Sequence, residues 1–266
     1  MLFPVILLCA GLMAGCVPRA NQPPPMRVLF VGNSLTYVGN LPATLRALAA
    51  KQGRVIETEM LVQGGAPLSQ RVVDGSVRAL LGRERFDHVV LQERGGDLAG
   101  FQDGAEPSAR AHAALVALAR EHGAQAWLLG TYQSLPRASL QLHAAESALA
   151  RELRIGHVAV SEPLRQASAA APTRDWLQPD FHPGPDLTLF KAALLYRALP
   201  GVAPDAHALL VAAPPYRGST GLRGDVPESA QRGAAAVTPY RYDAARVAAV
   251  LALAVTHGAE PATVTP

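Results

Sequence analysis

Short apolar runs alternate along the chain with longer segments of helical periodicity, and this alternation constrains the fold more than any other feature. Five runs have the length of strands: Val28–Val31, Val55–Val62, His88–Gln92, Ala126–Gly130 and His157–Val160. The helix-length segments are Pro42–Ala50, Ala109–Glu121, Ser139–Leu153 and Leu187–Leu199. Strands that alternate with helices form crossover units, in which a parallel sheet is covered on both faces. We therefore predict an α/β domain with a mostly parallel sheet of five strands.

The two ends of the chain do not follow this pattern. Residues 1–15 are apolar and small, in a run shorter than the ~20 residues of a spanning helix, which predicts a secretory signal. Residues 16–26 include Pro23-Pro24-Pro25 and are predicted to form a Pro-rich tether, with the folded domain over residues 27–266. Within that domain, residues 200–237 are rich in Gly, Pro and Ala and predict loop with short elements, before a last helix at Tyr242–His257. The role of residues 200–266 does not follow from the sequence.

The Ala14-Gly15-Cys16 ending of the signal resembles a bacterial lipobox. That resemblance implies that Cys16 is lipidated and becomes the first residue of the mature chain. The protein would then be lipid-anchored in the bacterial cell envelope, facing the periplasm or the exterior, with the membrane as a partner. An ordinary signal peptide with an incidental cysteine is the alternative.

Charge and motif content exclude several function classes. The net charge is +3, from 24 basic and 21 acidic side chains, and no basic run is interleaved with aromatic residues, so nucleic-acid binding is not predicted. The sequence has no His-Glu-x-x-His motif, no pair of metal-binding cysteines, no Walker loop and no Gly-x-Gly-x-x-Gly after its first strand. We therefore predict neither a metal nor a cofactor.

Ser34 follows directly on the first predicted strand, in Gly32-Asn33-Ser34-Leu35. The carboxyl ends of the strands are where an open α/β sheet places its chemistry. A serine hydroxyl there can act as a nucleophile if a base lies within reach, and nearby backbone N–H groups can bind an oxyanion. The surrounding residues do not form the Gly-x-Ser-x-Gly elbow of α/β-hydrolases. Alternatively, Ser34 only caps the next helix.

A base for this serine is predicted far downstream, in Asp180-Phe181-His182-Pro183. His182 precedes an apolar helix and so lies on a loop, and Asp180 is close enough to accept a hydrogen bond from its Nδ1 and fix its tautomer. The other histidines, seven of the eight, lack this combination of a nearby acid and a loop. We expect Ser34, His182 and Asp180 to act as nucleophile, base and orienting acid.

These motifs resemble the SGNH (GDSL-like) hydrolases, a family of serine esterases and lipases. The family's Gly-Asp-Ser-Leu block appears as Gly32-Asn33-Ser34-Leu35, and Thr36 with Leu41-Pro42 continues a Gly-Asn-Ser-Leu-Thr subgroup pattern. The family's last block, with its catalytic Asp and His, matches Asp180 and His182. The resemblance covers roughly residues 28–199. It implies a flavodoxin-like three-layer α/β/α sandwich.

The resemblance also implies an oxyanion hole, and here the chain departs from the family. The second block matches Gln63-Gly64-Gly65-Ala66, where Gly65 is the preferred N–H donor beside Ser34 and Gly64 the alternative. The third block's Asn is missing from Val90-Leu91-Gln92-Glu93-Arg94-Gly95. We predict that the Gln92 side-chain amide replaces this donor, with Arg94 as a second candidate. Alternatively, Gln92 belongs to a structural polar network at the strand end with Glu93 and Arg94.

The spacing of the last block is the second departure. The family places its Asp three residues before the His, a position that Pro179 holds here. Asp180 can still orient His182; a backbone carbonyl or Asp175 are the alternatives. The sequence thus predicts a serine ester hydrolase that acts, through an acyl-enzyme, on a small acyl ester of a carbohydrate or lipid in the cell envelope. The departures leave open a catalytically degenerate glycan- or lipid-binding lipoprotein, and an acyltransferase is a third reading.

Overall fold

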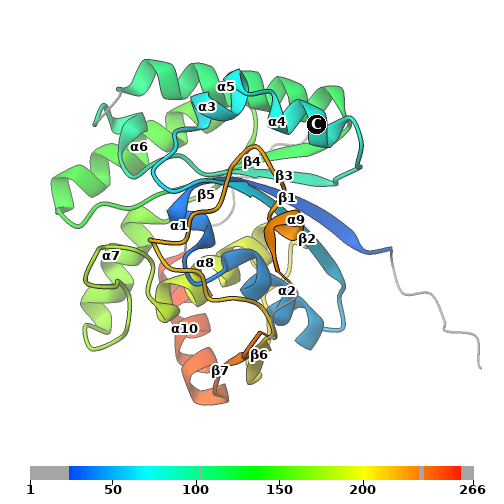
Figure 1. Cartoon of the computed structure of the whole chain (residues 1–266). Coiled ribbons are helices and arrows are strands. Elements are labelled where there is room, and N and C mark those ends of the chain that lie inside the picture. The colour runs from blue at the N-terminus through cyan, green and yellow to red at the C-terminus, as the bar shows by residue number, and fades with distance from the viewer. Residues whose placement is uncertain (1–23, 102–103, 234–236, 259–266) are drawn as a thin grey trace, which may run out of the picture.

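A parallel sheet of five strands forms the centre of the computed structural model, which describes residues 24–101, 104–233 and 237–258. The strands are β1 (Met26–Gly32), β2 (Ile56–Val62), β3 (His88–Leu91), β4 (Gln125–Leu129) and β5 (Gly156–Val158), in the order β2-β1-β3-β4-β5 (Figure 1). All five predicted strands are confirmed. The predicted signal, most of the tether and Cys16 lie outside the described residues.

Helices cover both faces of this sheet and make a flavodoxin-like three-layer sandwich, as predicted (Figure 1). One layer contains α1 (Ser34–Tyr37), α2 (Leu41–Lys51), α7 (Ser161–Ala170), α8 (Pro185–Ala198) and α10 (Ala244–His257). The other contains α3 (Leu68–Val73), α4 (Ser76–Leu81), α5 (Ala105–Glu121) and α6 (Pro136–Leu153), with a 3₁₀ turn, η1 (Asp97–Ala99). Among the described residues, no helix is both long and apolar enough to cross a membrane.

The alternation of side chains along β1 divides the interior into two hydrophobic cores. Val28 and Phe30 pack with the layer of α2 and α8, whereas Leu29 and Val31 pack with the layer of α3 and α5. All four are fully buried, because a strand in the middle of a covered sheet points successive side chains to opposite faces. Burial of each contributes about 1.5–3 kcal/mol.

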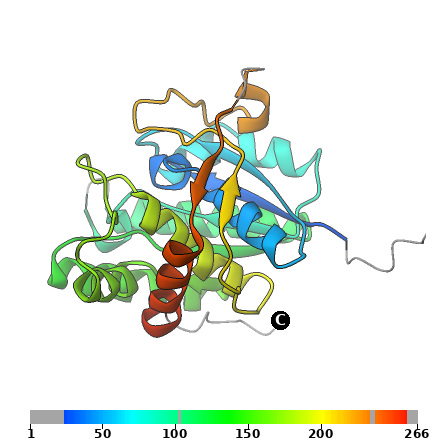
Figure 2. The ribbon, with the colours of Figure 1, turned by 90° about the horizontal axis from the view of Figure 1, so that it is seen from below.

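The C-terminal segment, residues 200–258, contains three short elements whose positions were not predicted from the sequence. An antiparallel pair, β6 (Leu209–Val211) and β7 (Tyr240–Tyr242), lies beside α2, and Figure 2 shows the two strands next to each other. A short helix, α9 (Glu228–Gln231), contacts β2. The residues between β6 and α9 return toward α1, drawn in orange in Figure 1. This return brings the segment to the carboxyl ends of the sheet strands.

Candidate active site

Ser34 is the first residue of α1, immediately beyond the carboxyl end of β1. The helix cap is Asn33, whose Oδ1 accepts a hydrogen bond from the Leu35 N–H at 3.0 Å. Ser34 instead lines a cavity. The chain can turn this tightly because residue 32 is glycine: a Cβ there would lie 2.5 Å from the Thr36 Oγ1. The alternative role of Ser34 as the helix cap is therefore filled by its neighbour.

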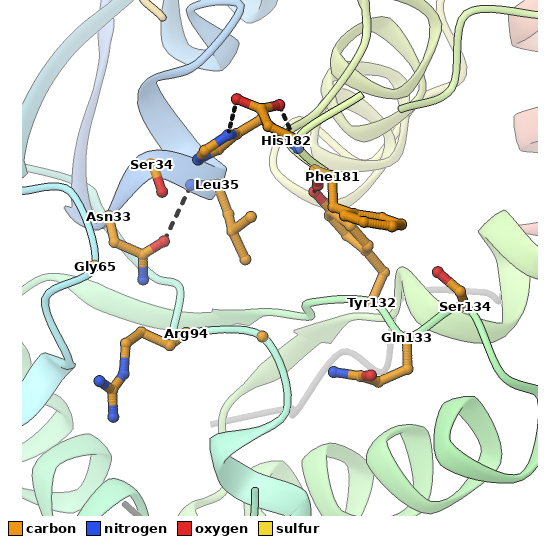
Figure 3. Close-up of a pocket in the computed structure, with 12 residues that line it drawn as sticks. Asn33, Ser34, Leu35, Gly65, Arg94, Tyr132, Gln133, Ser134, Phe181 and His182 are labelled. Carbon is orange, nitrogen blue, oxygen red and sulfur yellow. Dashed lines mark hydrogen bonds and ion pairs between the residues drawn. The ribbon is translucent and has the colours of Figure 1, made fainter. Parts of the chain in front are cut away.

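The cavity has a volume of about 360 Å³ and gathers residues from five loops that follow the sheet strands or precede α8. Ser34, Gly65, Arg94, Asp180 and His182 all contribute to its wall (Figure 3). Of the five catalytic and oxyanion-hole residues predicted from the sequence, all except Gln92 are thus brought together at one edge of the sheet. The remainder of the wall mixes apolar and polar residues: Asn33, Leu35, Gly95, Tyr132, Gln133, Ser134 and Phe181.

Asp180 reaches His182 despite the short spacing between them. The His182 Nδ1 lies 2.9 Å from the Asp180 Oδ2, and the His182 backbone N–H donates to the Asp180 Oδ1 at 3.2 Å (Figure 3). The side-chain hydrogen bond from His182 is the main cause that lowers the pKa of Asp180. Asp175, the sequence alternative, is elsewhere: its Oδ2 lies 2.7 Å from the Arg246 Nη2. The carboxylate that contacts the histidine is therefore Asp180.

Gly218 packs against the imidazole of His182, a contact that was not predicted from the sequence. A Cβ at Gly218 would lie 2.6 Å from the ring Cε1 and 2.9 Å from Nδ1. The Tyr37 hydroxyl donates to the Gly218 carbonyl oxygen at 3.2 Å, and the Gly39 N–H donates to the Tyr216 carbonyl oxygen at 3.2 Å. The C-terminal segment is thus fastened to α1 and its following turn, and it limits where the imidazole can lie.

Gln92 does not line the cavity. Its Oε1 accepts from the Thr36 hydroxyl at 2.7 Å, and its Nε2 donates to the Gly130 carbonyl oxygen at 3.1 Å. The side chain is buried beneath α1, where it joins the end of β3 to α1 and to the residue that follows β4. The Gln92 amide therefore has structural partners outside the cavity, and the structure does not support its predicted role as an oxyanion donor.

Its neighbours Glu93 and Arg94 divide between structure and cavity. The Glu93 carboxylate accepts from the Leu68 N–H at 3.1 Å, the Arg94 N–H at 2.9 Å and the Ser108 hydroxyl at 2.9 Å, so it belongs to the polar network considered above. Arg94 lines the cavity, but its guanidinium points away from Ser34 (Figure 3), with Nε donating to the buried Asp97 Oδ2 at 2.9 Å. The Asp97 carboxylate therefore fixes the direction of the Arg94 guanidinium.

A buried lysine underlies the serine turn and was also not predicted. Lys191, on α8, has a fully buried side chain, and its Nζ donates to the Leu35 carbonyl oxygen. Burial lowers the pKa of Lys191 to about 7. Within the described ranges, no group of three or more His, Cys, Asp or Glu side chains is arranged to hold a metal ion.

Sheet order, covered faces and a cavity at the strand ends place this chain in the flavodoxin-like α/β class. Neither a family model nor a curated protein matches the sequence. Among solved structures, a DUF4886 family protein from Bacteroides uniformis superposes with a TM-score of 0.58 at 14% identity, over 87% of this chain and 94% of its own.

Two esterases are similar over a smaller part of the chain. The acetyl xylan esterase AlAXEase has a TM-score of 0.54 at 16% identity, over 65% of this chain and 100% of its own. The psychrotrophic esterase EstA from Pseudoalteromonas, inhibited by monoethylphosphonate, has a TM-score of 0.50 at 17% identity, over 66% of this chain and 97% of its own. At these identities the likeness establishes the shared fold.

Proposed function

We propose that this protein is a serine ester hydrolase. The observation that carries the proposal is one cavity that holds Ser34 together with His182, whose Nδ1 lies 2.9 Å from the Asp180 carboxylate. A nucleophile, a base and a group that orients the base are the parts that acyl transfer requires. The shared fold with two esterases, one of them inhibited by a phosphonate, supports the same chemistry.

In the proposed mechanism, the Ser34 Oγ attacks the acyl carbonyl carbon while the His182 Nε2 takes its proton. Asp180 holds the imidazole through Nδ1 and stabilises the imidazolium. The backbone N–H groups of Ser34 and Gly65 bind the oxyanion, and Arg94, which lines the cavity, is the remaining candidate for a third donor in place of Gln92. The alcohol then leaves with the proton from His182, and water repeats the attack to release the acid.

The cavity favours a short acyl group. Its volume of about 360 Å³ and its mixed wall suit an acetyl or similar group better than a long chain. The alcohol portion is proposed to be a carbohydrate or lipid of the cell envelope, because the sequence of the amino end predicts export and lipidation at Cys16. An acetyl xylan esterase among the structures with this fold is consistent with an acetylated carbohydrate.

Hydrolysis of 4-nitrophenyl acetate tests the proposal directly. Ser34→Ala should lower kcat by at least about 1,000-fold, because the nucleophile is lost while binding is kept. Ser134→Ala is the matched control, since Ser134 lines the same cavity without a neighbouring base, and it should keep most of the activity. A serine-reactive phosphonate should label the protein at Ser34, and the structure of the adduct would show which donors face the phosphoryl oxygen.

Absence of both turnover and labelling, over acyl chains from acetyl to octanoyl, would instead favour the degenerate binding lipoprotein. The loss of the third-block Asn is the observation behind that second candidate, because removing one oxyanion donor costs on the order of 100- to 1,000-fold in rate. An acyltransferase would be recognised if an added alcohol competed with water for the acyl-enzyme.

A further inference from the structure

A second cavity, of about 620 Å³, lies beside the proposed active site. One wall comes from the residues between β2 and α4, and the other comes from residues 218–225 of the C-terminal segment. The two cavities meet at two places. Gly64 lines the second cavity and Gly65 the first, and Gly218 of the second packs against the His182 ring of the first.

The boundary between the cavities carries no side chain at Gly64 and Gly65, and both residues are exposed. A ligand whose ester carbonyl lies at Ser34 and Gly65 can therefore extend over these glycines into the second cavity. The Tyr37 hydroxyl, which donates to the Gly218 carbonyl oxygen, fixes the far side of this passage. The second cavity can thus hold the part of the substrate that extends beyond the ester group and does not fit in the cavity at Ser34.

A buried guanidinium organises the wall of the second cavity. The Arg71 Nη1 lies 2.9 Å from the Asp74 Oδ2, and its Nη2 donates to the Gln63 Oε1 at 3.2 Å. The Arg71 side chain is almost fully buried and packs against the backbone at Gly224 of the C-terminal segment, where a Cβ would lie 2.0 Å from Nη1. The carboxylate and amide in the wall are therefore held in fixed orientations.

The charges around this cavity balance. Arg71 is paired with Asp74, and the Arg223 Nη2 lies 2.7 Å from the Asp225 Oδ2. A cavity with paired charges does not select an anion. The exposed Gln70 and Ser219 add amide and hydroxyl groups to its wall, in which Leu222 and the Tyr37 ring are the large apolar surfaces, fewer than an acyl chain needs. Amide and hydroxyl groups both donate and accept hydrogen bonds and a carboxylate accepts them, and together these are the partners that sugar hydroxyls require.

We propose that the second cavity binds the carbohydrate portion of the substrate, a neutral sugar that is the alcohol side of the ester. The inference rests on the proposed function for the position of the ester bond, and it narrows the substrate class from a carbohydrate or lipid ester to a carbohydrate ester. Sugar binding itself needs only the second cavity. It can therefore be measured apart from hydrolysis.

The test compares two kinds of acetate. O-acetylated xylobiose and O-acetylated cellobiose present a sugar, whereas 4-nitrophenyl acetate does not. The double variant Gln70→Ala/Ser219→Ala should lower the ratio of kcat/KM for the better disaccharide acetate to kcat/KM for 4-nitrophenyl acetate by about tenfold, since two hydrogen bonds are lost. The control is Gln166→Ala, an exposed glutamine on α7 away from both cavities, which should leave the ratio unchanged.

Calorimetric binding of xylobiose and cellobiose to Ser34→Ala separates this inference from the proposed function. Binding of either disaccharide that weakens about tenfold when Gln70→Ala/Ser219→Ala is added supports the sugar site, even if no ester is hydrolysed. Hydrolysis of 4-nitrophenyl acetate by the wild type, with no binding of either disaccharide and no effect of the double variant on the ratio, would overturn the sugar site and leave the esterase in place.

Discussion

Phe181 explains how a two-residue spacing can join an acid to a histidine. Its backbone is left-handed, with φ of 63°, a conformation that costs a bulky residue roughly 1 kcal/mol or more. The Tyr132 hydroxyl donates to the Phe181 carbonyl oxygen at 2.8 Å and helps to hold this turn. The turn lets the Asp180 carboxylate contact both the backbone N–H and Nδ1 of His182. The left-handed turn at Phe181 thus allows Asp180 to orient His182, although Pro179 occupies the position three residues before the histidine.

At the residue scale, the contact between Gly218 and His182 gives the first prediction. Gly218→Ala should lower kcat for 4-nitrophenyl acetate by about 100-fold, because a methyl group 2.6 Å from Cε1 must displace the imidazole or the segment that carries residue 218. KM should change less than kcat, since the position of the base is altered more than the cavity itself. Steady-state kinetics measure both constants.

Gly221→Ala is the matched control for this substitution. A Cβ at Gly221 would meet nothing within 4 Å, although the residue lies in the same segment. Its kcat and thermal stability should therefore stay near those of the wild type. Equal rates for the wild type and Gly218→Ala would show that the segment does not set the position of His182.

The site was predictable from the sequence only where a residue follows directly from the position of an element. Ser34 and Gly65 come just after strands and Asp180 just before an apolar helix, and the structure places all three in one cavity. The direction of Gln92 was not predictable, because it depends on hydrogen bonds that its amide makes with distant parts of the fold. Gly218 carries no motif, and only the three-dimensional path of the chain brings it to His182.

At the element scale, Lys191 of α8 predicts a pH-dependent stability. Burial lowers the pKa of Lys191 to about 7 from 10.5, so between these values the unfolded chain binds a proton that the native protein does not. The free energy of unfolding should therefore rise with pH across this window. This contribution is fully present above about 10.5 and is lost as the pH falls through about 7. The Lys191→Met variant has no titrating group at this position and should lack this pH dependence.

Urea unfolding at about pH 6.5 and about pH 9.5 measures the effect. The stability of the wild type relative to Lys191→Met should increase from the lower to the higher pH. Lys51→Met is the control, because Lys51, the other lysine of the chain, is exposed at the end of α2. A pH-independent difference between the wild type and Lys191→Met would contradict a lowered pKa.

The packing of α10 on α8 gives a second prediction at this scale. The Arg246 Nε lies 2.7 Å from the Oδ1 of Asp186, which is only 3% exposed, and the Arg246 Nη2 lies 2.7 Å from the Asp175 Oδ2. Arg174 is farther from Asp186, at 3.8 Å. Arg246→Met should therefore lower the free energy of unfolding by about 3 kcal/mol, because a buried carboxylate loses its closest cation.

Denaturant unfolding measures that change, with Arg241→Met as the control. Arg241 is exposed on β7, so its substitution should alter stability by less than about 0.5 kcal/mol. If Arg246→Met were as stable as Arg241→Met, the ion pairs of α10 would contribute nothing to the attachment of the loop that carries Asp180 and His182.

Element prediction succeeded where the hydrophobic pattern was long or strong. The five strands are apolar runs because both faces of the sheet are covered, and α5 and α6 are long enough for helical periodicity. Their starts lie a few residues earlier than expected, at Ala105 and Pro136. The helices α3, α4 and α7 were not predicted, because segments of six to ten residues show too few repeats of the helical period.

At the scale of the whole molecule, the C-terminal segment completes one of the two hydrophobic cores. Side chains from beyond Leu199 are buried in the core shared with α2 and α8: Leu209, Val211, Tyr242, Val247 and Leu251. The two esterases with this fold align over 65–66% of this chain while nearly all of their own length is covered. About a third of the protein is therefore additional to the fold that it shares with them, and part of it is structural.

This dependence predicts that the α/β part will not fold by itself. A chain of residues 24–199 should lack a cooperative urea transition, because the five core side chains contribute about 10 kcal/mol together, which is comparable with the whole stability of a typical domain. A chain of residues 24–258 is the control and should unfold cooperatively, with near-ultraviolet circular dichroism like that of the full chain. A cooperative transition of the shorter chain at the same urea midpoint would show that the segment serves only the two cavities. Loss of the transition would mean that one segment both completes the core and places Gly218 against His182.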